Sequence, residues 1–391
     1  MNENLLLKYL YICYLEARRH KRHTHSQMVF ESNLIENLIQ LRDDIYNQKY
    51  VISPSIYFIQ KHPIHREVFA GNFRDRIVHH LVYDIISSYR EKQFIYDSYS
   101  CRRWKGTSKW IERISKFMRA CSDNYKENWW ILKLDIQWYF MSINRDILWE
   151  KVNDTIDNWG NISFIWNSLY EWFPRYLIMW KFPDYLKKVI HDIIYNDPTK
   201  NWIFKGKKSD YNWLPLTKSL FYTAENCGLP IWNLTSQLFS NIYLNELDHY
   251  IKENLWIKYY GRYVDDFVII HKDKDYLKSI IPSIRVFLQT NLKLTLHPKK
   301  IYLQPISHWV QFLWAFIKPY RNYRAKRTIS NFRKKMKECN YMPNEQSLNS
   351  YLWLFIHYKQ YKLVQKIMWN IKFDNMKKIS DLINYYKDSS F

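Results

Sequence analysis

The residues best suited to chemistry are two adjacent carboxylates, Asp265 and Asp266, between two apolar runs. The stretch Tyr260–Ile270 enters with aromatic and β-branched residues and leaves as the apolar run Phe267–Ile270, which predicts a β-hairpin with both aspartates near its bend. Adjacent carboxylates repel each other and are costly to desolvate, and a divalent cation removes that cost. An isolated Asp-Asp pair is more often a solvated turn. The flanking strands favour a site of hard oxygen ligands suited to Mg²⁺.

A third carboxylate, Asp135, ends the apolar run Trp130–Leu134 and is followed by Ile136 and Phe140. Two-metal phosphoryl transfer needs a further carboxylate from another strand, so that two ions about 4 Å apart can be bridged. An aspartate at the end of one strand, followed later by a hairpin that carries Asp-Asp, is the layout of a polymerase palm. The sequence therefore predicts that Asp135 shares a cleft with the Asp265 carboxylate.

Composition indicates the kind of partner. The 391 residues suffice for two or three subdomains, and 59 Lys+Arg against 37 Asp+Glu give a net charge of +22. Such an excess implies a polyanion or an acidic membrane surface. No apolar run approaches the length of a membrane span and the first residues lack a signal-peptide pattern, so we expect nucleic acid and no membrane. Five scattered cysteines without a Cys-x-x-Cys pair favour a reducing compartment and argue against structural zinc.

Helices and strands must position these carboxylates. Apolar spacing predicts helices at Leu5–Arg18, Phe30–Tyr46, Arg76–Ser88, Leu238–Asn254 and Tyr276–Thr290. Residues 146 to about 215 read as a helical insertion punctuated by prolines. We expect a strand at Leu294–Ile301 and a short apolar hairpin at Trp309–Trp314. Together these elements predict an α+β fold.

Basic residues occur in three regions. Arg66, Arg74 and Arg76 could bind a triphosphate or a template backbone, because the planar fork of arginine suits phosphate oxygens. Their alternative role is ion pairing with Glu67 and Asp75. Two further groups are predicted to bind nucleic acid, one interleaved with aromatic residues and one at the start of a basic C-terminal region: Arg102, Arg103 and Lys105, and Arg324, Lys326 and Arg327.

The ordered series of motifs resembles a reverse transcriptase, with Tyr263–Asp266 as its catalytic hairpin. The resemblance runs from about Arg66 to Tyr361. Reverse transcriptases in general carry Gln-Gly-x-x-x-Ser-Pro before that hairpin, and this chain has Ile231–Gln237, with an aliphatic residue first and Ser-Gln last. That departure, together with Arg74–His80 and Leu296–Lys300, is similar to the reverse transcriptases of diversity-generating retroelements.

The resemblance implies a right-hand polymerase with N-terminal helices and fingers at 1–128, a palm at 129–318 that contains the helical insertion, and a basic helical thumb at 319–391. It implies an RNA-directed DNA polymerase that copies a template-repeat RNA into cDNA with errors at adenines, for transfer into a variable target gene. Implied partners are the template RNA, the primer or cDNA strand, dNTPs and a small, basic, oligomeric accessory protein. The implied location is the cytoplasm of a prokaryote, or of a cell carrying a phage that encodes the chain.

The resemblance also assigns roles to residues. Two Mg²⁺ ions, for which Mn²⁺ could substitute, would be held by Asp135, Ile136, Asp265 and Asp266. A lysine after the last palm strand could protonate the leaving pyrophosphate, and Lys300 fits the family spacing better than Lys299, although either could be a surface lysine. Phe140 falls where the family places an aromatic residue that excludes a ribose 2′-hydroxyl. The implied nucleotide-binding set is Arg66, Arg74, Arg76, Phe140, Ile231, Trp232, Ser236 and Gln237.

Other interpretations stay open at this stage. A group II intron or retron reverse transcriptase would share the palm, but the Ser-Gln sequence does not suit a retron. A catalytically inactive RNA-binding relative would have the same composition. A metal-dependent nuclease would also use clustered carboxylates, but it does not explain the ordered polymerase motifs.

Glycine is abnormally rare. The chain has 6 Gly and 18 Trp, whereas ordinary usage predicts on the order of 27 Gly. The family has glycine at six positions where this chain has Trp104, Trp138, Trp232, Trp309, Trp314 and Trp353. Overpacking one such site costs about 1–3 kcal/mol. We hypothesise that these codons are UGA, which some bacterial lineages read as glycine and another code reads as tryptophan. A degenerated, inactive relative is the alternative.

Overall fold

The computed structural model describes residues 1–19, 24–60, 65–159, 164–165, 176–177, 181–206, 209, 214–313, 315–324, 326–340 and 348. The chain divides into two compact units: Met1–Gly106 with Ile131–Leu303, and Thr107–Trp130 with Gln304–Phe391. Each unit joins segments that are distant in the sequence. The predicted fingers, palm and thumb boundaries stay a prediction.

Three helices begin the first unit: α1 (Glu3–Arg18), α2 (His25–Ser32) and α3 (Leu34–Tyr46). Helix α1 starts where the Asn2 side chain accepts a hydrogen bond from the Leu5 N–H at 2.9 Å. The single helix predicted over Phe30–Tyr46 is wrong, because Asn33 has φ −132° and ψ 56° and separates α2 from α3. Helix α1 packs against α4 (Phe73–Arg90).

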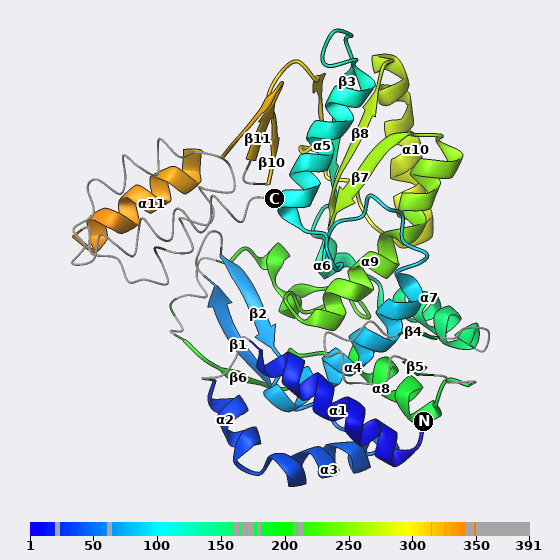
Figure 1. Cartoon of the computed structure of the whole chain (residues 1–391), viewed down its shortest axis with the longest axis vertical. Coiled ribbons are helices and arrows are strands. Elements are labelled where there is room, and N and C mark those ends of the chain that lie inside the picture. Colours follow the sequence, from blue (N-terminus) through cyan, green and yellow to red (C-terminus); the bar gives the residue numbers. More distant parts are fainter. Residues whose placement is uncertain are drawn as a thin grey trace. The chain divides into compact units, whose positions relative to one another are not determined.

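A three-stranded sheet follows, with the order β2-β1-β6 (Figure 1). Strands β1 (Ser55–Gln60) and β2 (Arg66–Ala70) are antiparallel, and β6 (Trp202–Phe204) lies parallel to β1. The prediction of an all-helical insertion is therefore wrong at β6, where three aromatic and β-branched residues suit a strand.

The rest of that insertion is mixed. Helices α7 (Arg145–Asp157) and α8 (Asp184–Tyr195) confirm its helical part, because α8 buries residues at helical spacing such as Leu186, Val189, Ile190 and Ile193. Between them, β4 (Phe164–Ile165) and β5 (Tyr176–Leu177) form a two-stranded ladder that the sequence did not predict.

A four-stranded sheet has the strand order β7-β8-β3-β9. Its strands are β3 (Trp130–Asp135), β7 (Tyr259–Tyr263), β8 (Asp266–His271) and β9 (Tyr302–Pro305). The predicted hairpin is confirmed, with Tyr263 paired to Asp266. The strand predicted at Leu294–Ile301 is wrong: that segment contributes one bridge, Ile136 to Leu296, and Pro298 has no N–H to donate to a ladder.

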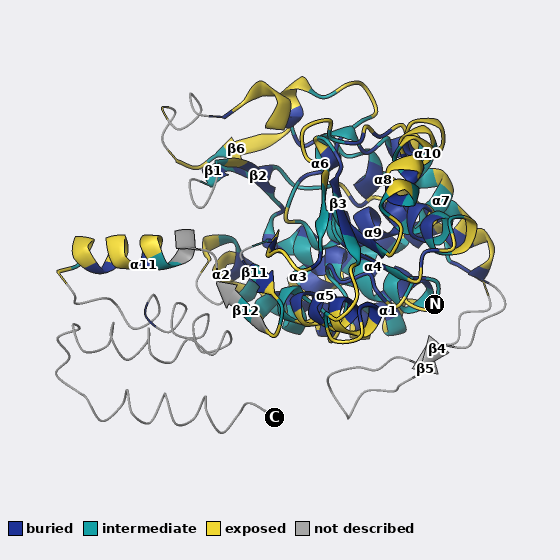
Figure 2. Ribbon diagram, turned by 90° about the horizontal axis from the view of Figure 1, so that it is seen from above, coloured by how far each residue is buried: buried dark blue, intermediate teal, exposed yellow. Residues whose placement is uncertain are grey.

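Two helices support this sheet, α9 (Leu234–His249) and α10 (Lys274–Leu292). Helix α9 continues into a single π-helical turn, Tyr250–Asn254, and α10 packs on β8. Figure 2 shows α9 in dark blue over much of its length, and both polar and apolar residues of this helix are buried. Helix α9 therefore belongs to the core of the first unit.

The second unit contains α5 (Thr107–Cys121), the sheet β10-β11-β12 and α11 (Lys326–Glu338). Its strands are β10 (Val310–Phe312), β11 (Ala315–Lys318) and β12 (Arg321–Arg324). The hairpin predicted at Trp309–Trp314 is confirmed for β10, whereas the strand that pairs with it, β11, begins only at Ala315. No helix in the described part of the chain is long and apolar enough to cross a membrane.

Candidate active site

A cavity of about 320 Å³ lies in the first unit, and predicted residues from distant segments meet around it. They are Arg66, Asp135, Ile136, Phe140, Ile231, Asp265 and Lys300. Residues that were not predicted to form the site also line it: Tyr139, Met141, Thr217, Lys218 and His297. Asp135 and Asp265 therefore share one cleft, as the palm prediction requires.

Asp135 ends β3 and is held by Lys300. The Lys300 Nζ lies 3.0 Å from both Oδ1 and Oδ2 of Asp135, and the His297 N–H donates to the Asp135 carbonyl oxygen at 2.9 Å. The segment that was predicted to be a strand therefore runs beside β3 and brings Lys300 to the carboxylate. This placement fits the predicted choice of Lys300 over Lys299.

Asp265 and Asp266 lie at the turn between β7 and β8, where Val264 has φ 58°. Burial, and then the neighbouring carboxylates of Asp266 and Asp135, raise the pKa of Asp265 to about 7. Burial also raises the pKa of Asp266, although Lys133 opposes the shift with its Nζ 3.5 Å from Asp266 Oδ1. The three carboxylates together therefore exceed in number the two lysines that pair with them, Lys133 and Lys300.

The donor set fits a divalent cation, but the carboxylates are held by lysines. In the described residues no three His, Cys, Asp or Glu side chains are arranged to hold one ion together. Lys300 holds Asp135 and Lys133 holds Asp266 instead. The carboxylates of Asp135 and Asp265 line the cavity, and burial together with the neighbouring carboxylates raises the pKa of Asp265. A cation at Asp135 or Asp266 would compete with these ammonium groups.

A buried ion pair supports the catalytic turn. Arg262 and Asp248 are both fully buried, with Nη2 to Oδ2 at 2.6 Å and Nε to Oδ1 at 2.8 Å. Arg262 also donates to the Val264 carbonyl oxygen at 2.9 Å, within the turn that carries Asp265. Sequence reasoning missed this pair, although a charged residue within an apolar strand and another on an apolar helix were a usable signal.

The segment before α9 contributes one residue to the cavity. Gly228 has φ 96°, and its N–H donates to the Ile143 carbonyl oxygen at 2.9 Å, so the loop lies against the turn that follows Asp135. Ile231 lines the cavity. Ser236 and Gln237 do not: Ser236 is buried in α9, and Gln237 accepts a hydrogen bond from the Cys101 thiol. Their predicted nucleotide contacts stay a prediction, because Ser236 is buried and Gln237 has a partner within the protein.

The three fingers arginines have separate positions. Arg66 lines the cavity. Arg74 does not, because its Nη2 donates to Asp44 at 2.6 Å and braces α3 against α4. Arg76 donates from Nε to the Gly71 carbonyl oxygen at 2.9 Å. Arg74 therefore pairs within the protein, and Arg76 uses its Nε there, and nucleotide binding by these two residues stays a prediction.

The predicted template-binding cations differ in a similar way. The Arg102 side chain is 6% exposed and pairs with Glu91 at 2.7 Å, so it acts inside the protein. Lys105 lies 3.9 Å above the Tyr96 ring, and Arg103 is exposed. The side chains predicted to contact nucleic acid in the C-terminal region lie outside those that the structure describes: Arg324, Lys326 and Arg327.

Tryptophans occupy left-handed backbone, which is unusual for a bulky residue. Three of them stand where the resemblance implies glycine: Trp104 (φ 60°), Trp138 (φ 49°) and Trp232 (φ 82°). Trp256, which was not singled out from the sequence, has φ 51°. All four are exposed, at 90%, 48%, 49% and 86% respectively. Trp138 also lines the cavity, so its indole takes space beside Asp135.

The other three tryptophans that stand where the resemblance implies glycine provide no evidence of left-handed backbone. Trp309 is not left-handed, and its ring packs edge-on against Phe316 with the centroids 4.9 Å apart. Trp314 and Trp353 lie outside the described residues.

The chain is similar to known proteins. The family described as reverse transcriptase (RNA-dependent DNA polymerase) matches residues 59–342. No curated protein matches the chain. Among solved structures, it is similar to apo telomerase from Candida tropicalis truncated from its C-terminal domain, with TM-score 0.47, 14% identity and coverage of 74% of this chain and 60% of that one. It is also similar to telomerase from Candida albicans in complex with a fragment of telomeric RNA, with TM-score 0.48, 12% identity and coverage of 92% and 62%. The chain thus spans about three fifths of the length of these structures.

Proposed function

The chain belongs to the reverse transcriptase family and is an RNA-directed DNA polymerase of right-hand, α+β fold, and from that premise we propose that it serves a diversity-generating retroelement. In this function it copies a template-repeat RNA into cDNA with errors concentrated at adenines. The resulting cDNA then enters a variable target gene.

The observation that carries this proposal is the position of Ile231. It lines the same cavity as Asp135 and Asp265, so the residue at this position borders the space in which the templating pair and the incoming nucleotide react. An aliphatic side chain has no hydrogen-bonding group with which to test a base or sugar edge. Glutamine, which reverse transcriptases in general carry here, has both a donor and an acceptor.

The proposed chemistry uses two Mg²⁺ ions, or Mn²⁺, which when bound supply charge stabilisation and lower the pKa of the primer 3′-hydroxyl. Asp135, Asp265 and Asp266 would hold them, with Ile136 beside Asp135. Burial disfavours the Lys300 ammonium, but its bonds to Asp135 outweigh that effect and raise its pKa, so it carries a proton to donate to the leaving pyrophosphate. Phe140 lines the cavity, where an aromatic ring would exclude a ribose 2′-hydroxyl.

As a reverse transcriptase the chain binds template RNA, and the net charge of +22 suits the phosphate backbone. The finer partners belong to the proposal: the cDNA primer strand, dNTPs and a small, basic, oligomeric accessory protein. The proposed location is the cytoplasm of a prokaryote, or of a cell carrying the phage that encodes the chain.

Primer extension on an RNA template of balanced composition tests the proposal. We expect misincorporation to concentrate opposite template adenines, and Ile231→Gln to reduce it at adenines more than at other bases. The matched control is Ile203→Gln, an exposed aliphatic residue on β6 that does not line the cavity. An error rate that is equal at all four bases, or that Ile231→Gln leaves unchanged, would contradict the proposal.

One observation favours a second candidate, a catalytically inactive RNA-binding relative. Trp138 lines the cavity where a nucleotide must enter. If the tryptophans are genuine, RNA binding without primer extension is the expected behaviour, and the same assay distinguishes the two candidates.

A further inference from the structure

The segment Pro215–Gly228 forms part of the cavity wall although it carries no recognised motif. It contains two short 3₁₀ turns, η3 (Leu216–Lys218) and η4 (Leu220–Tyr222). Thr217 and Lys218 of η3 line the cavity that also contains Asp135 and Asp265. This segment therefore brings a cation to the reaction space.

Strand β2 supplies a second cation and an anchor from adjacent positions. Successive residues of a strand point to opposite faces. Arg66 lines the cavity, whereas Glu67 is 2% exposed. Glu67 Oε2 accepts from Ser219 Oγ at 2.7 Å, and Oε1 accepts from the Leu220 N–H at 2.7 Å. The carboxylate therefore holds the junction of η3 and η4, directly after Lys218.

The partners of Glu67 are neutral, so its charge is not matched by a neighbouring cation. Its third partner is the Tyr57 hydroxyl at 3.4 Å, and burial raises the pKa of Glu67 despite these bonds. A carboxylate whose charge lacks a cationic partner is costly to bury. The presence of Glu67 at this buried position therefore indicates that its hydrogen bonds fix the loop that contains Ser219 and Leu220.

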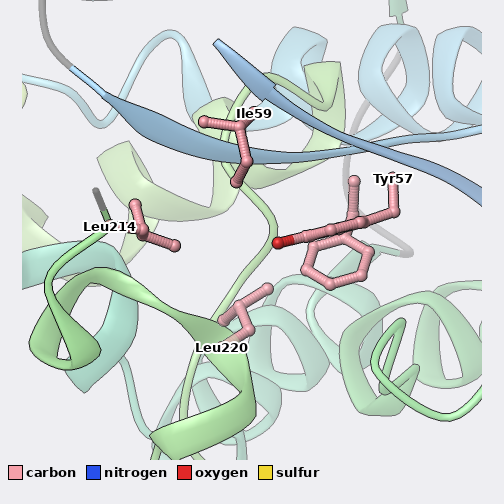
Figure 3. Packing of buried hydrophobic residues seen from close by; sticks show 5 residues of the cluster. Tyr57, Ile59, Leu214 and Leu220 are labelled. Carbon is pink, nitrogen blue, oxygen red and sulfur yellow. The ribbon is translucent and has the colours of Figure 1, made fainter. Parts of the chain in front are cut away.

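Apolar packing fixes the same loop. Leu220 belongs to a buried cluster with Tyr57, Ile59, Phe69 and Leu214, and Figure 3 shows Ile59, Leu214 and Leu220 gathered around the Tyr57 ring. On the other side, a Cβ added to Gly228 would lie 2.7 Å from Leu220 Cδ2. Leu220 is therefore held between the fingers sheet and the loop that precedes α9, which leaves η3 little freedom to move.

Two cations on the cavity wall are not used by the carboxylates. Lys300 and Lys133 hold Asp135 and Asp266. Within the described residues, neither Arg66 nor Lys218 has an ion-pair partner, and both border the cavity. A nucleoside triphosphate carries several negative charges that such cations recognise.

We propose that Arg66, Thr217 and Lys218 bind the triphosphate of the incoming nucleotide, and that Glu67 is the positioning residue that sets Lys218 beside Arg66. This inference rests on the proposed assignment of the cavity as the polymerase site. It adds Thr217, Lys218 and Glu67 to the residues that determine nucleotide affinity.

Steady-state primer extension and equilibrium binding of a fluorescent dNTP to the full chain test the inference. Lys218→Ala should weaken dNTP binding and raise the dNTP KM on the order of 10-fold or more, while Lys218→Arg should retain most of the affinity. Glu67→Gln should raise KM by a similar factor while kcat changes less than about threefold. The double variant should bind dNTP no more weakly than Lys218→Ala alone, because both changes remove the same contact.

The controls are matched by type. Lys278→Ala removes an exposed lysine that pairs with Asp275 on α10 and should leave KM unchanged. Asp75→Asn alters another buried carboxylate, which accepts from Tyr50 and Ser53 and lies 3.7 Å from Arg74 Nη1, and should lower thermal stability without affecting KM.

An additive effect of Glu67→Gln and Lys218→Ala, an unchanged KM in Lys218→Ala, or no saturable dNTP binding by the chain would overturn the inference. The proposed function fails separately. Loss of the adenine bias with an intact effect on KM would remove the retroelement assignment and leave the triphosphate site standing.

Discussion

Replacing left-handed tryptophans with glycine should cost the protein little or nothing. We consider a variant with glycine at Trp104, Trp138, Trp232 and Trp256, whose φ values lie between 49° and 82°. An L-residue with a side chain in this region costs about 1–2 kcal/mol, and glycine does not. Glycine loses about 0.5–1 kcal/mol through the greater freedom of the unfolded chain. The net change at each position is therefore between about zero and 1.5 kcal/mol in favour of glycine.

Removing each indole also removes its packing contacts, which opposes the gain from glycine. This loss is small because the four indoles are 48% to 90% exposed. The matched control is Trp159→Gly in the same compact unit. Trp159 is 1% exposed, is not left-handed, and packs edge-on against Phe182 with the ring centroids 4.9 Å apart. Truncation of such a core residue costs about 3–5 kcal/mol. The two kinds of position should therefore differ by at least ~3 kcal/mol per site.

Urea unfolding of the fourfold variant, of its four single variants and of Trp159→Gly, followed by circular dichroism, measures this difference. The fourfold variant should unfold at the same urea concentration as the unchanged protein or at a higher one, and Trp159→Gly should unfold at a much lower one. Primer extension should appear or increase in the fourfold variant, because removing the Trp138 indole opens the cavity. The gene provides an independent reading, with UGA expected at the four left-handed positions and UGG at Trp159. UGG codons at the four positions, or a loss of more than about 1 kcal/mol at each of them, would refute the reasoning.

Further predictions concern the carboxylates and their supports. Asp265→Asn should abolish DNA synthesis while leaving RNA binding, measured by filter retention, within about threefold; equal synthesis would exclude its catalytic role. The pKa of Asp265 is raised from 3.8 to about 7, so its contribution to the stability of the metal-free protein is fully present below about pH 3.8 and is lost as the pH rises to about 7. The polymerisation rate at subsaturating Mg²⁺ should instead rise as the Asp265 carboxyl loses its proton. A flat Mg²⁺ affinity between about pH 6 and 8 would contradict this assignment. Arg262→Ala should lower the free energy of unfolding by about 3–5 kcal/mol because it leaves Asp248 buried without a partner, and urea unfolding measures this. Lys300→Ala should lower kcat more than the dNTP KM, in contrast to Lys218→Ala, and single-turnover kinetics would separate these effects.

The catalytic hairpin could be predicted from the sequence because its signal is local. Aromatic and β-branched residues before Asp265 and the apolar run after Asp266 specify both the strands and the turn, and Asp135 ends a strand whose pattern is equally clear. The strand β6 could not be predicted in the same way. Its three residues become a strand only because the edge of β1 is available to pair with them, and that edge is distant in the sequence.

Side-chain roles were harder to predict than elements. Arg66, Arg74 and Arg102 have the same chemistry in the sequence, and only the fold shows that Asp44 and Glu91 occupy the last two. Positive charge alone does not distinguish an arginine that binds a phosphate from one that forms an ion pair between two helices. The proposed role of Lys218 could not be predicted, because an isolated lysine in a loop belongs to no sequence motif.

The lysines at the carboxylates connect the charge of the site with its chemistry. Three aspartates beside two lysines leave an excess of negative charge, and burial beside the other carboxylates accordingly raises the pKa of Asp265. The Lys300 ammonium lies 3.0 Å from both carboxylate oxygens of Asp135, where a metal ion would also bind. Release of Asp135 by Lys300 is therefore the step that would free the carboxylate for a metal ion and the ammonium for a leaving pyrophosphate. Lysine is ordinarily protonated at neutral pH, so Lys300 would keep its proton after that release, and a triphosphate held by Arg66 and Lys218 would be its next anionic neighbour. The order of events that follows from these charges is binding of the nucleotide first and proton donation second.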